Sequence, residues 1–332
     1  MATSETVPFS KSGGLADVVG ALSATLTEMG NEVRIFMPMY SFIEKEGWHK
    51  SLSFLIPMLG TNERAEIYEK EVNGVVYVGL SHPYFSKRLG IYGDTSFQPY
   101  PDNCPRFLCF AKATALYLAA TDWKVDIVHC HDWTTGLIPY YLNYFKVEAK
   151  TVFTIHNLAY QGVFPPFDAL ISSSRIPKSA LRGPKAHENI NMMAAGLLDC
   201  DFITTVSPTY MEEIRESGMG CGLDDILKDR KDDSKGIING IDYNEWNPET
   251  DKDLISNYSV SDLSGKEECK KELLEEFKIK GYDDKPLFAI ISRLADQKGF
   301  DELLLEGEPC ALERILQNHD SAVVLIGTGD SK

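Results

Sequence analysis

The chain has 332 residues, of which 43% are hydrophobic and 25% charged, a composition that is ordinary for a globular protein of two domains. Its formal net charge of −16 disfavours binding to nucleic acids and to anionic membranes, because those surfaces are themselves negative. No apolar stretch approaches the length that spans a membrane and no signal peptide is visible, so we expect a cytoplasmic protein.

The seven cysteines show neither a disulfide framework nor a metal-binding pattern. Their number is odd, and no two of them are spaced as C-x-x-C. We therefore expect free thiols in a reducing compartment. The cysteines are residues 104, 109, 130, 200, 221, 269 and 310.

The first element in chain order is a helix that follows a cation and two glycines. Apolar residues recur with a 3.6-residue period over residues 15–29, and Gly30 is placed to end the helix. Gly13 and Gly14 have no side chains, so a ligand could reach free N–H groups at the helix start, where the helix dipole attracts anions. Lys11 adds a full positive charge. Taken alone, a glycine turn with a solvated lysine explains this segment equally well.

Short apolar runs rich in β-branched residues alternate with helical patterns. Runs without polar alternation are typical of parallel strands that are buried on both faces. The expected strands are residues 33–37, 75–78 after the hairpin-type pair Asn73-Gly74, 126–129, 151–155, 202–206, 236–238, 287–291 and 322–326. The expected helices are residues 105–121, 189–199, 208–216, 264–280 and 299–317. This alternation predicts an α/β fold.

The pattern divides into two domains. Residues 244–286 are rich in Lys, Glu and Asp and contain no strong strand, so we interpret 1–243 as the first domain and 244–332 as a linker with the start of a second. Fewer than about 50 residues remain from the first strand of the second domain onward, which is too few for a complete doubly wound sheet. Only a stub precedes Glu5, although a glycine-rich turn normally follows a full strand. We therefore expect a fragment in which the segment around Lys11 has little support.

Polar residues directly follow five of the expected strands. Ligands of open parallel sheets bind beyond the carboxyl ends of the strands, so these residues are the candidates for a site. Each has a simpler explanation when taken alone, as a helix cap, a core histidine, a turn residue or a surface charge. Their shared placement favours one binding site. In the order of those explanations, the residues after four of the strands are Asp132, His156, Asn239, and the pair Arg293 and Lys298. The strand over 202–206 is followed by Ser207 and Pro208.

The cations suit a phosphorylated ligand. Arg grips a diphosphate bidentately, and Lys places a point charge on it. Lys11 belongs to the first domain, whereas Arg293 and Lys298 belong to the second, and a closing cleft would bring them together and exclude water. No carboxylate cluster indicates a metal, and the chain has no P-loop, no G-x-G-x-x-G and no G-x-S-x-G motif. We therefore expect no metal and no cofactor.

Seven segments together carry a family resemblance over nearly the whole chain. The chain resembles bacterial and plant glycogen and starch synthases, which are ADP-glucose-dependent glucosyltransferases of the GT-B fold. The segments, in the family's order, are residues 5–17 with K-S-G-G-L-A-D, 100–103 with Y-P-D-N, 129–133 with H-C-H-D-W, 154–162 with T-I-H-N-L-A-Y-Q-G, 206–210 with V-S-P-T-Y, 238–242 with I-N-G-I-D, and 292–299 from S-R-L to K-G.

The resemblance implies a fold and a reaction. The GT-B fold consists of two Rossmann-like, doubly wound α/β domains that face each other across a cleft, and the second would be incomplete here. The family transfers glucose from ADP-glucose to the non-reducing end of an α-1,4-glucan, such as glycogen or a maltooligosaccharide, and retains the anomeric configuration. A departing phosphate oxygen would help to deprotonate the acceptor hydroxyl. A plant or algal source would place the protein in the plastid.

The resemblance also implies roles for single residues. Lys11 would contact the phosphates of ADP-glucose, and Gly13 and Gly14 would let its backbone approach them. Arg293 and Lys298 would neutralise the departing diphosphate.

The remaining implied roles concern the sugar. His156 would lie against the transferring glucose. The donor and acceptor cleft would be lined by Tyr100, Asp132, Asn157 and Asn239. No clear nucleophilic carboxylate is present, although Glu5 and Asp132 leave that point open.

The chain departs from the family pattern in two respects. Ser12 stands where the family usually has Thr. The family's second domain continues beyond Asp330 with an E-x7-E region and a second glycine-rich loop, so we expect the polypeptide of 332 residues to have little or no synthase activity. Two alternatives stay open: an inactive glucan- or nucleotide-binding fragment, and another GT-B transferase that uses UDP-glucose.

Overall fold

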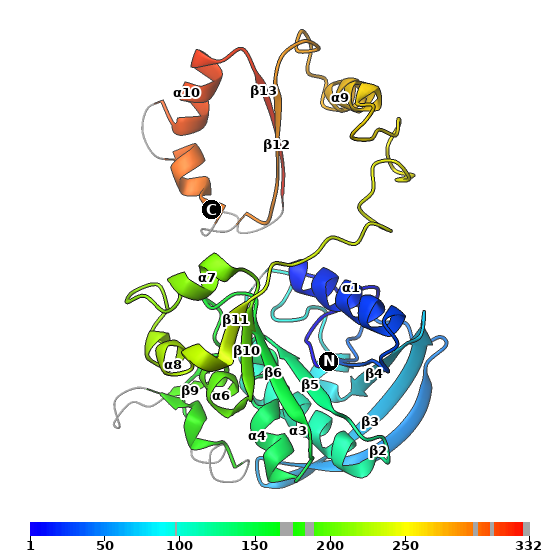
Figure 1. The fold of residues 1–332 in the computed structure, drawn as a ribbon, viewed down its shortest axis with the longest axis vertical. Helices are drawn as coiled ribbons and strands as arrows, with labels where there is room; N and C mark the ends of the chain where they lie inside the picture. The colour runs from blue at the N-terminus through cyan, green and yellow to red at the C-terminus, as the bar shows by residue number, and fades with distance from the viewer. Residues whose placement is uncertain (97, 167–174, 183–188, 295–297, 306–308, 328–332) are drawn as a thin grey trace. The chain divides into compact units, whose positions relative to one another are not determined.

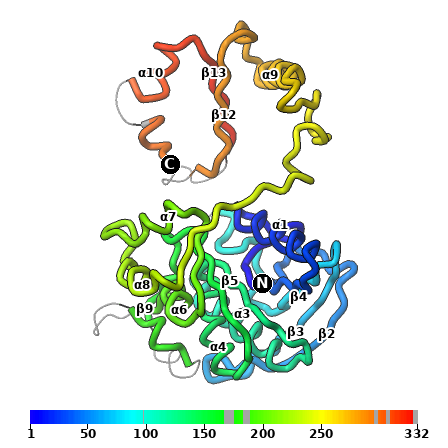
Figure 2. Tube along the Cα trace, viewed as in Figure 1, coloured from blue at the N-terminus to red at the C-terminus, as the bar shows by residue number. Residues whose placement is uncertain are grey.

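The computed structural model describes residues 1–332 except 97, 167–174, 183–188, 295–297, 306–308 and 328–332. The chain divides into two units, Met1–Gly240 and Ile241–Lys332, each with its own strands and helices (Figures 1 and 2). Both units combine parallel strands with helices, which confirms the predicted α/β class.

The first unit is built on two four-stranded sheets. One has the order β1-β4-β3-β2, with β1 parallel to β4 and β3 antiparallel to both of its neighbours. The other has the order β11-β10-β6-β5 and is entirely parallel. Their strands are β1 (Arg34–Pro38), β2 (His49–Met58), β3 (Thr61–Val72), β4 (Val75–Ser81), β5 (Ile127–His131), β6 (Lys150–Ile155), β10 (Phe202–Thr205) and β11 (Ser234–Gly236). A small antiparallel sheet, β7-β9-β8, consists of Val163–Phe164, Asn189–Asn191 and Leu181–Arg182.

The first three residues join the two four-stranded sheets. The backbone of Ala2 pairs in parallel with both Phe36 of β1 and Cys130 of β5. The Ala2 N–H donates to the carbonyl of His129 at 2.8 Å, and the Thr3 N–H donates to that of Phe36 at 3.0 Å. Ala2 and Thr3 are fully buried. The expectation that the following loop lacks support is therefore wrong, because strands pair with this short segment on both of its sides.

The helices of the first unit pack on these sheets. Helix α1 lies against β4, and α3 lies against β1, β2 and α4. Helix α3 is almost wholly buried and supplies much of the core. The helices are α1 (Gly14–Glu28), α2 (Pro83–Ser86), α3 (Asn103–Ala120), α4 (Ile138–Tyr144), α6 (Met192–Asp199), α7 (Pro208–Glu213) and α8 (Asp224–Asp229), with the 3-10 turns η1 (Trp133–Thr135), η2 (Lys178–Ala180) and η3 (Lys231–Asp233).

Helix α1 confirms most of its predicted features. It buries Leu15 and Val19 of the expected apolar face. Gly30 adopts a φ of 88°, a left-handed conformation that suits glycine just beyond a helix end. Met29, the last residue of the predicted face, is 73% exposed because the helix ends at Glu28.

Several predicted boundaries were wrong. The predicted strand over 236–238 is instead β11, which ends at Gly236, and Ile237 and Ile238 are exposed where the chain leaves the sheet edge. The helix predicted from residue 189 begins at Met192, because residues 189–191 form β9 and the Asn191 side chain caps the helix. The hairpin turn before β4 is confirmed, since Asn73 and Gly74 have φ values of 51° and 79°.

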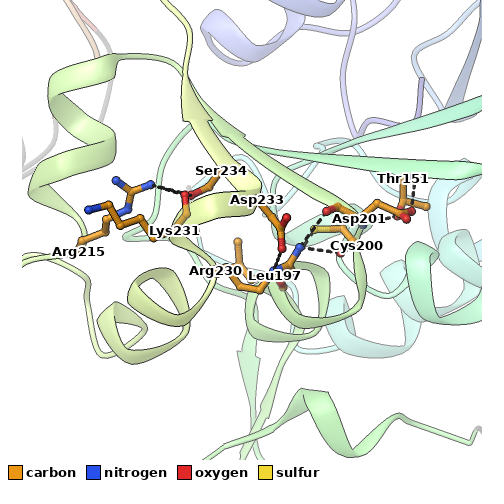
Figure 3. A network of polar contacts seen from close by, with 9 residues as sticks. All are labelled: Thr151, Leu197, Cys200, Asp201, Arg215, Arg230, Lys231, Asp233 and Ser234. Carbon is orange, nitrogen blue, oxygen red and sulfur yellow. Dashed lines mark hydrogen bonds and ion pairs between the residues drawn. The ribbon is translucent and has the colours of Figure 1, made fainter.

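A network of polar contacts connects the amino ends of β6 and β10 (Figure 3). The Arg230 guanidinium donates to the carbonyls of Leu197, Cys200 and Asp201, where α6 leads into β10. The Asp201 carboxylate accepts the N–H and the hydroxyl of Thr151 in β6, both at 2.8 Å. The network thus stabilises the sheet at the edge opposite the carboxyl ends of these strands.

The second unit contains a two-stranded parallel sheet and three described helical segments. These elements are α9 (Ser264–Glu276), β12 (Leu287–Ile291), the π-helical turn η5 (Asp301–Leu305), α10 (Ala311–Asn318) and β13 (Ala322–Ile326). The single helix predicted over 299–317 is therefore wrong, and residues 306–308 within it lie outside the described part. The expected burial of β12 on both faces is also wrong, because Phe288 and Ile291 are 53% and 78% exposed.

Two further observations concern the whole described chain. All seven cysteines are free thiols, as predicted. Among the described residues, no helix combines the length and apolar character needed to cross a membrane.

Candidate functional site

The candidate residues of the first unit follow strands at one edge of its sheet. The segment Met1–Thr3 leads into the loop before α1, β5 leads to Asp132, and β6 leads to His156. Because Met1–Thr3, β5 and β6 are adjacent and parallel, their carboxyl ends lie side by side. This edge is where a ligand of such a sheet is expected.

The loop before α1 presents Lys11 beside two uncrowded glycines. Lys11 is exposed, and its ammonium contacts the carboxylate of Asp17, on the first turn of α1, at 2.7 Å. A Cβ placed on Gly13 or Gly14 would meet no heavy atom within 4 Å. A ligand can therefore reach the backbone at both glycines.

We had expected the backbone N–H groups of this loop to be free, but two of them are occupied. The carboxylate of Glu5 accepts the N–H of Ser12 and, at 3.2 Å, that of Gly13. It also accepts the hydroxyl of Ser12 at 2.9 Å. An acidic side chain of the protein itself therefore accepts two of the N–H groups that the sequence analysis left free for an external anion.

Asp132 fixes the segment that carries His156. Its Oδ1 atom accepts the backbone N–H of His156 at 2.8 Å and that of Asn157 at 3.3 Å. It makes no capping hydrogen bond to η1, so the helix-cap explanation is wrong. Asp132 adopts φ 57° and ψ 179°, a conformation that costs energy for a residue with a side chain. Burial raises the pKa of its carboxyl to about 7.

His156 belongs to a row of three histidines, of which His131 is buried and His129 and His156 are half-buried. Its Nε2 atom lies 3.0 Å from Nδ1 of His131, and the ring of His131 lies 4.1 Å from that of His129. Nε2 of His129 is in turn 2.6 Å from the hydroxyl of Thr154. Burial lowers the pKa of His156 to about 4, that of His129 to about 3, and that of His131 well below its ordinary value. The three rings are therefore neutral near pH 7.

The structure places the other predicted residues in different surroundings. Asn157 follows His156, and its Oδ1 atom accepts the N–H of Ala159 at 3.0 Å. The hydroxyl of Tyr100 accepts the N–H of Gly90 at 3.1 Å, and the guanidinium groups of Arg88 and Arg106 lie 5.2 and 4.9 Å from its ring.

Asn239 and the two predicted cations of the second unit are exposed. Asn239 lies in the segment that follows β11, at the end of the first unit. Arg293 and Lys298 follow β12 in the second unit, and residues 295–297 between them lie outside the described part. The structure therefore assembles Lys11, Asp132, His156 and Asn157 at one sheet edge, and it leaves Arg293 and Lys298 on a separate unit.

Trp133 and Gly162 support residues 156–162, the segment after β6 that we call the His156 segment, and neither was among the predicted site residues. The indole of Trp133 packs on Phe107 and Phe164, with ring centroids 4.9 and 5.8 Å apart. Gly162 has a φ of 62°, and a Cβ there would lie 2.3 Å from the indole. The glycine that ends H-N-L-A-Y-Q-G could have been suspected from this motif, but its partner could not.

Two other features of the described part bear on the site. No group of three or more His, Cys, Asp or Glu side chains there could hold a metal ion. A surface hollow of about 530 Å³ is lined by residues 146–150 and 199–201 together with Asn143. It lies at the amino ends of β6 and β10, so it is remote from the candidate site.

Comparisons with known proteins agree with one another. A family model described as "Starch synthase catalytic domain" matches residues 1–229. The chain is 39% identical to glycogen synthase 2 of Geobacter sulfurreducens over 343 aligned residues, which cover 100% of this chain and 69% of that protein. It is 36% identical to the glycogen synthase of Geobacillus stearothermophilus, with 99% and 67% covered.

A solved structure extends the similarity to the fold. The catalytic domain of starch synthase IV from Arabidopsis thaliana, bound to ADP and acarbose, matches with a TM-score of 0.83 and 28% identity. The match covers 99% of this chain and 68% of that one. It confirms the GT-B fold that the sequence resemblance implied.

Proposed function

The chain belongs to the glycogen and starch synthase family of glucosyltransferases, and on that premise we propose that it takes glucose from ADP-glucose and adds it to an α-1,4-glucan. The bound ADP and acarbose of the Arabidopsis structure support a nucleotide sugar and a glucan as ligands. One observation carries the proposal. The loop before α1 that contains Lys11 and Gly13, which we call the Lys11 loop, and the His156 segment converge at one edge of the sheet.

Lys11 contacts the donor phosphates in this proposal. Its ion pair with Asp17 is open to solvent, with 45% of the lysine and 33% of the aspartate side chain exposed, and such surface pairs contribute about 0–1 kcal/mol. A diphosphate can therefore replace Asp17 at little cost. Gly13 and Gly14 let the phosphates approach the start of α1, where the helix dipole favours negative charge.

His156 binds the transferring glucose as a neutral ring. A pKa of about 4 makes imidazolium rare near pH 7, so the ring exchanges hydrogen bonds with sugar hydroxyls and does not serve as a general acid. Asp132 sets the place of His156 through the backbone, and Asn157, Asn239 and Tyr100 complete the sugar site. The acceptor hydroxyl then gives its proton to the departing phosphate oxygen, with retention at the anomeric carbon.

Arg293 and Lys298 of the second unit neutralise the departing diphosphate. Arg supplies paired donors and Lys a point charge, so the two replace the charge that a metal ion would otherwise provide. The proposal therefore includes neither a metal nor an organic cofactor. The free cysteines support a reducing compartment, which is the cytoplasm or, for a plant or alga, the plastid.

Release of ADP from ADP-glucose, with and without glycogen, tests this function. The chain covers 69% of glycogen synthase 2 of Geobacter sulfurreducens, so this and the later kinetic tests use the chain extended by the remaining part of that relative. In this extended chain we expect glycogen-dependent release that UDP-glucose does not match. Lys11→Ala should raise KM for ADP-glucose or lower kcat by about tenfold or more, since charged hydrogen bonds to phosphate contribute about 1.5–3 kcal/mol. The control is Lys124→Ala, because Lys124 is exposed at the opposite end of β5. Equal use of UDP-glucose would contradict the donor, and an unaffected Lys11→Ala would remove Lys11 from the phosphate site.

A further inference from the structure

Glu5 is a buried carboxylate to which the proposed function gives no role. The residue is 3% exposed. Its Oε2 atom accepts the N–H groups of Ser12 and Gly13, and its Oε1 atom accepts the hydroxyls of Ser12 at 2.9 Å and Tyr92 at 2.8 Å. A carboxylate has about four lone-pair sites, so these four neutral donors fill its accepting capacity.

These contacts determine the shape of the Lys11 loop. The backbone of Gly13 is extended, with φ −165° and ψ −170°, and the N–H groups of Ser12 and Gly13 converge on one carboxylate oxygen. Hydrogen bonds to an ionised acceptor are stronger than neutral ones, so they order this turn effectively. The outer side of Gly13 stays open to a ligand.

Tyr92 extends the same contacts to a second segment. Its hydroxyl also lies 2.7 Å from the hydroxyl of Ser4, and its ring centroid is 6.4 Å from that of Trp133. Burial, with the nearby Glu5 carboxylate, raises the pKa of Tyr92 well above its ordinary value, so the phenol remains protonated. Glu5 therefore joins the Lys11 loop to the segment that holds Tyr92 and leads to Tyr100.

We propose that Glu5 is a positioning residue, whose carboxylate holds the Lys11 loop in the shape that receives the donor diphosphate. This inference rests on the proposed function. It also argues against Glu5 as the nucleophile, one of the two carboxylates for which the sequence left that role open. A nucleophilic carboxylate needs a lone pair free to attack the sugar, whereas both oxygens of Glu5 already accept two hydrogen bonds each.

Two substitutions of Glu5 separate positioning from nucleophilic catalysis. In Glu5→Gln the amide oxygen can still accept both N–H groups, and the amide nitrogen can donate to the hydroxyls of Ser12 and Tyr92 once these rotate. Tyr92 can then donate to Ser4, since either hydroxyl of that pair is able to donate. In Glu5→Ala all four contacts are lost. Tyr92→Phe is a milder variant that removes only one of them.

Hydrogen exchange of the backbone over residues 8–18 measures the loop without any substrate. We expect faster exchange of the Ser12 and Gly13 amides in Glu5→Ala, near wild-type exchange in Glu5→Gln, and no change over α9 in either variant. This readout decides the positioning role even if the extended chain used for the kinetics transfers no glucose, an outcome that would reject the proposed function alone. Equal exchange in all three proteins would overturn the inference.

Kinetics with ADP-glucose and glycogen supply the second readout. Glu5→Ala should raise KM for ADP-glucose about tenfold or more, with a smaller change in KM for glycogen, and Glu5→Gln should stay within about threefold of the wild type. Tyr92→Phe should lie between the two. If Glu5→Ala does not fold, Glu5→Gln and Tyr92→Phe still decide the question. An inactive but folded Glu5→Gln would show that the charge itself reacts, and the inference would then be wrong.

Discussion

Oδ1 of Asp132 accepts the backbone N–H of His156 at 2.8 Å, so the residue after one strand determines the position of the residue after its neighbour. The residue is half-buried, and desolvation raises the pKa of its carboxyl to about 7, above the 3.8 of an ordinary aspartate. The structure thus uses a carboxyl as an anchor for the backbone, in a setting that disfavours its charged form.

Asp132→Asn should stabilise the protein at high pH. With a raised folded-state pKa, the wild-type contribution of Asp132 to stability is complete below pH 3.8 and is lost as pH rises through about 7. The asparagine oxygen can accept the same N–H groups and never ionises. The free energy of unfolding of the Asp132→Asn variant, measured with urea, should exceed that of the wild type at pH 8 by an amount on the order of 3 kcal/mol. The difference should be smaller at pH 5.

Asp132→Ala provides the comparison. It loses both backbone hydrogen bonds and should be less stable than Asp132→Asn at either pH. An advantage of Asp132→Asn that is larger at pH 5 than at pH 8 would contradict the pKa assignment.

Acid should destabilise the protein through His129, His131 and His156. Their folded-state pKa values lie below 6.5, so their contribution is complete above pH 6.5 and is lost as pH falls toward 4. Each histidine contributes a slope of about 1.4 kcal/mol per pH unit, and Asp132 opposes one of them. His156→Gln should reduce the slope of unfolding free energy against pH, measured between pH 5 and 6, by the contribution of one histidine, about 1.4 kcal/mol per pH unit.

An exposed histidine serves as the control for that slope. His49 lies at the start of β2 and is exposed. His49→Gln should leave the slope of unfolding free energy against pH unchanged. A slope that His156→Gln also leaves unchanged would mean that His156 is not held neutral by burial.

The sequence predicted those parts of the site that depend on local order along the chain. Lys11, Asp132 and His156 could be placed because a strand and its following residue always lie together at a sheet edge. The contact of Glu5 with Ser12 and the hydrogen bonds from Asp132 depend on the folded geometry of two segments, which no local periodicity encodes. The motif K-S-G-G therefore indicated an anion site, but it did not reveal that Glu5 fills part of that site.

The strands that the sequence missed have a different physical cause. In β3, Ala65 and Ile67 are buried while the residues between and beside them are largely charged or polar. Such half-exposed antiparallel strands have a weak hydrophobic signal, unlike β6, in which Phe153, Thr154 and Ile155 are buried in succession. Buried strands have a strong hydrophobic signal, and they were therefore predicted within a few residues.

Gly162→Ala should destabilise the protein by about 2–4 kcal/mol. The new Cβ would overlap the indole of Trp133, which Phe107 and Phe164 hold in place, and φ 62° adds backbone strain. Thermal unfolding measures the loss. Gly240→Ala is the matched control, because a Cβ there meets nothing within 4 Å. Equal stability of the two variants would show that the indole moves aside.

Gly13→Ala and Gly14→Ala decide whether this glycine pair serves a ligand or only a turn. Neither glycine has a left-handed φ, and neither Cβ would meet an atom of the protein, so the unliganded fold has no need of glycine at either position. Alanine at Gly14, the first residue of α1, should even raise helix stability, by up to about 1 kcal/mol. Thermal unfolding should therefore be unchanged or slightly improved.

Donor binding should respond in the opposite direction. If the diphosphate approaches the backbone at these glycines, an added methyl group lies in its path and KM for ADP-glucose should rise about tenfold, a cost of about 1.4 kcal/mol. KM for glycogen should change much less, which makes the acceptor an internal control. If both variants are stable and KM for ADP-glucose is unchanged, the backbone at these glycines has no close ligand. The K-S-G-G motif would then be only a turn.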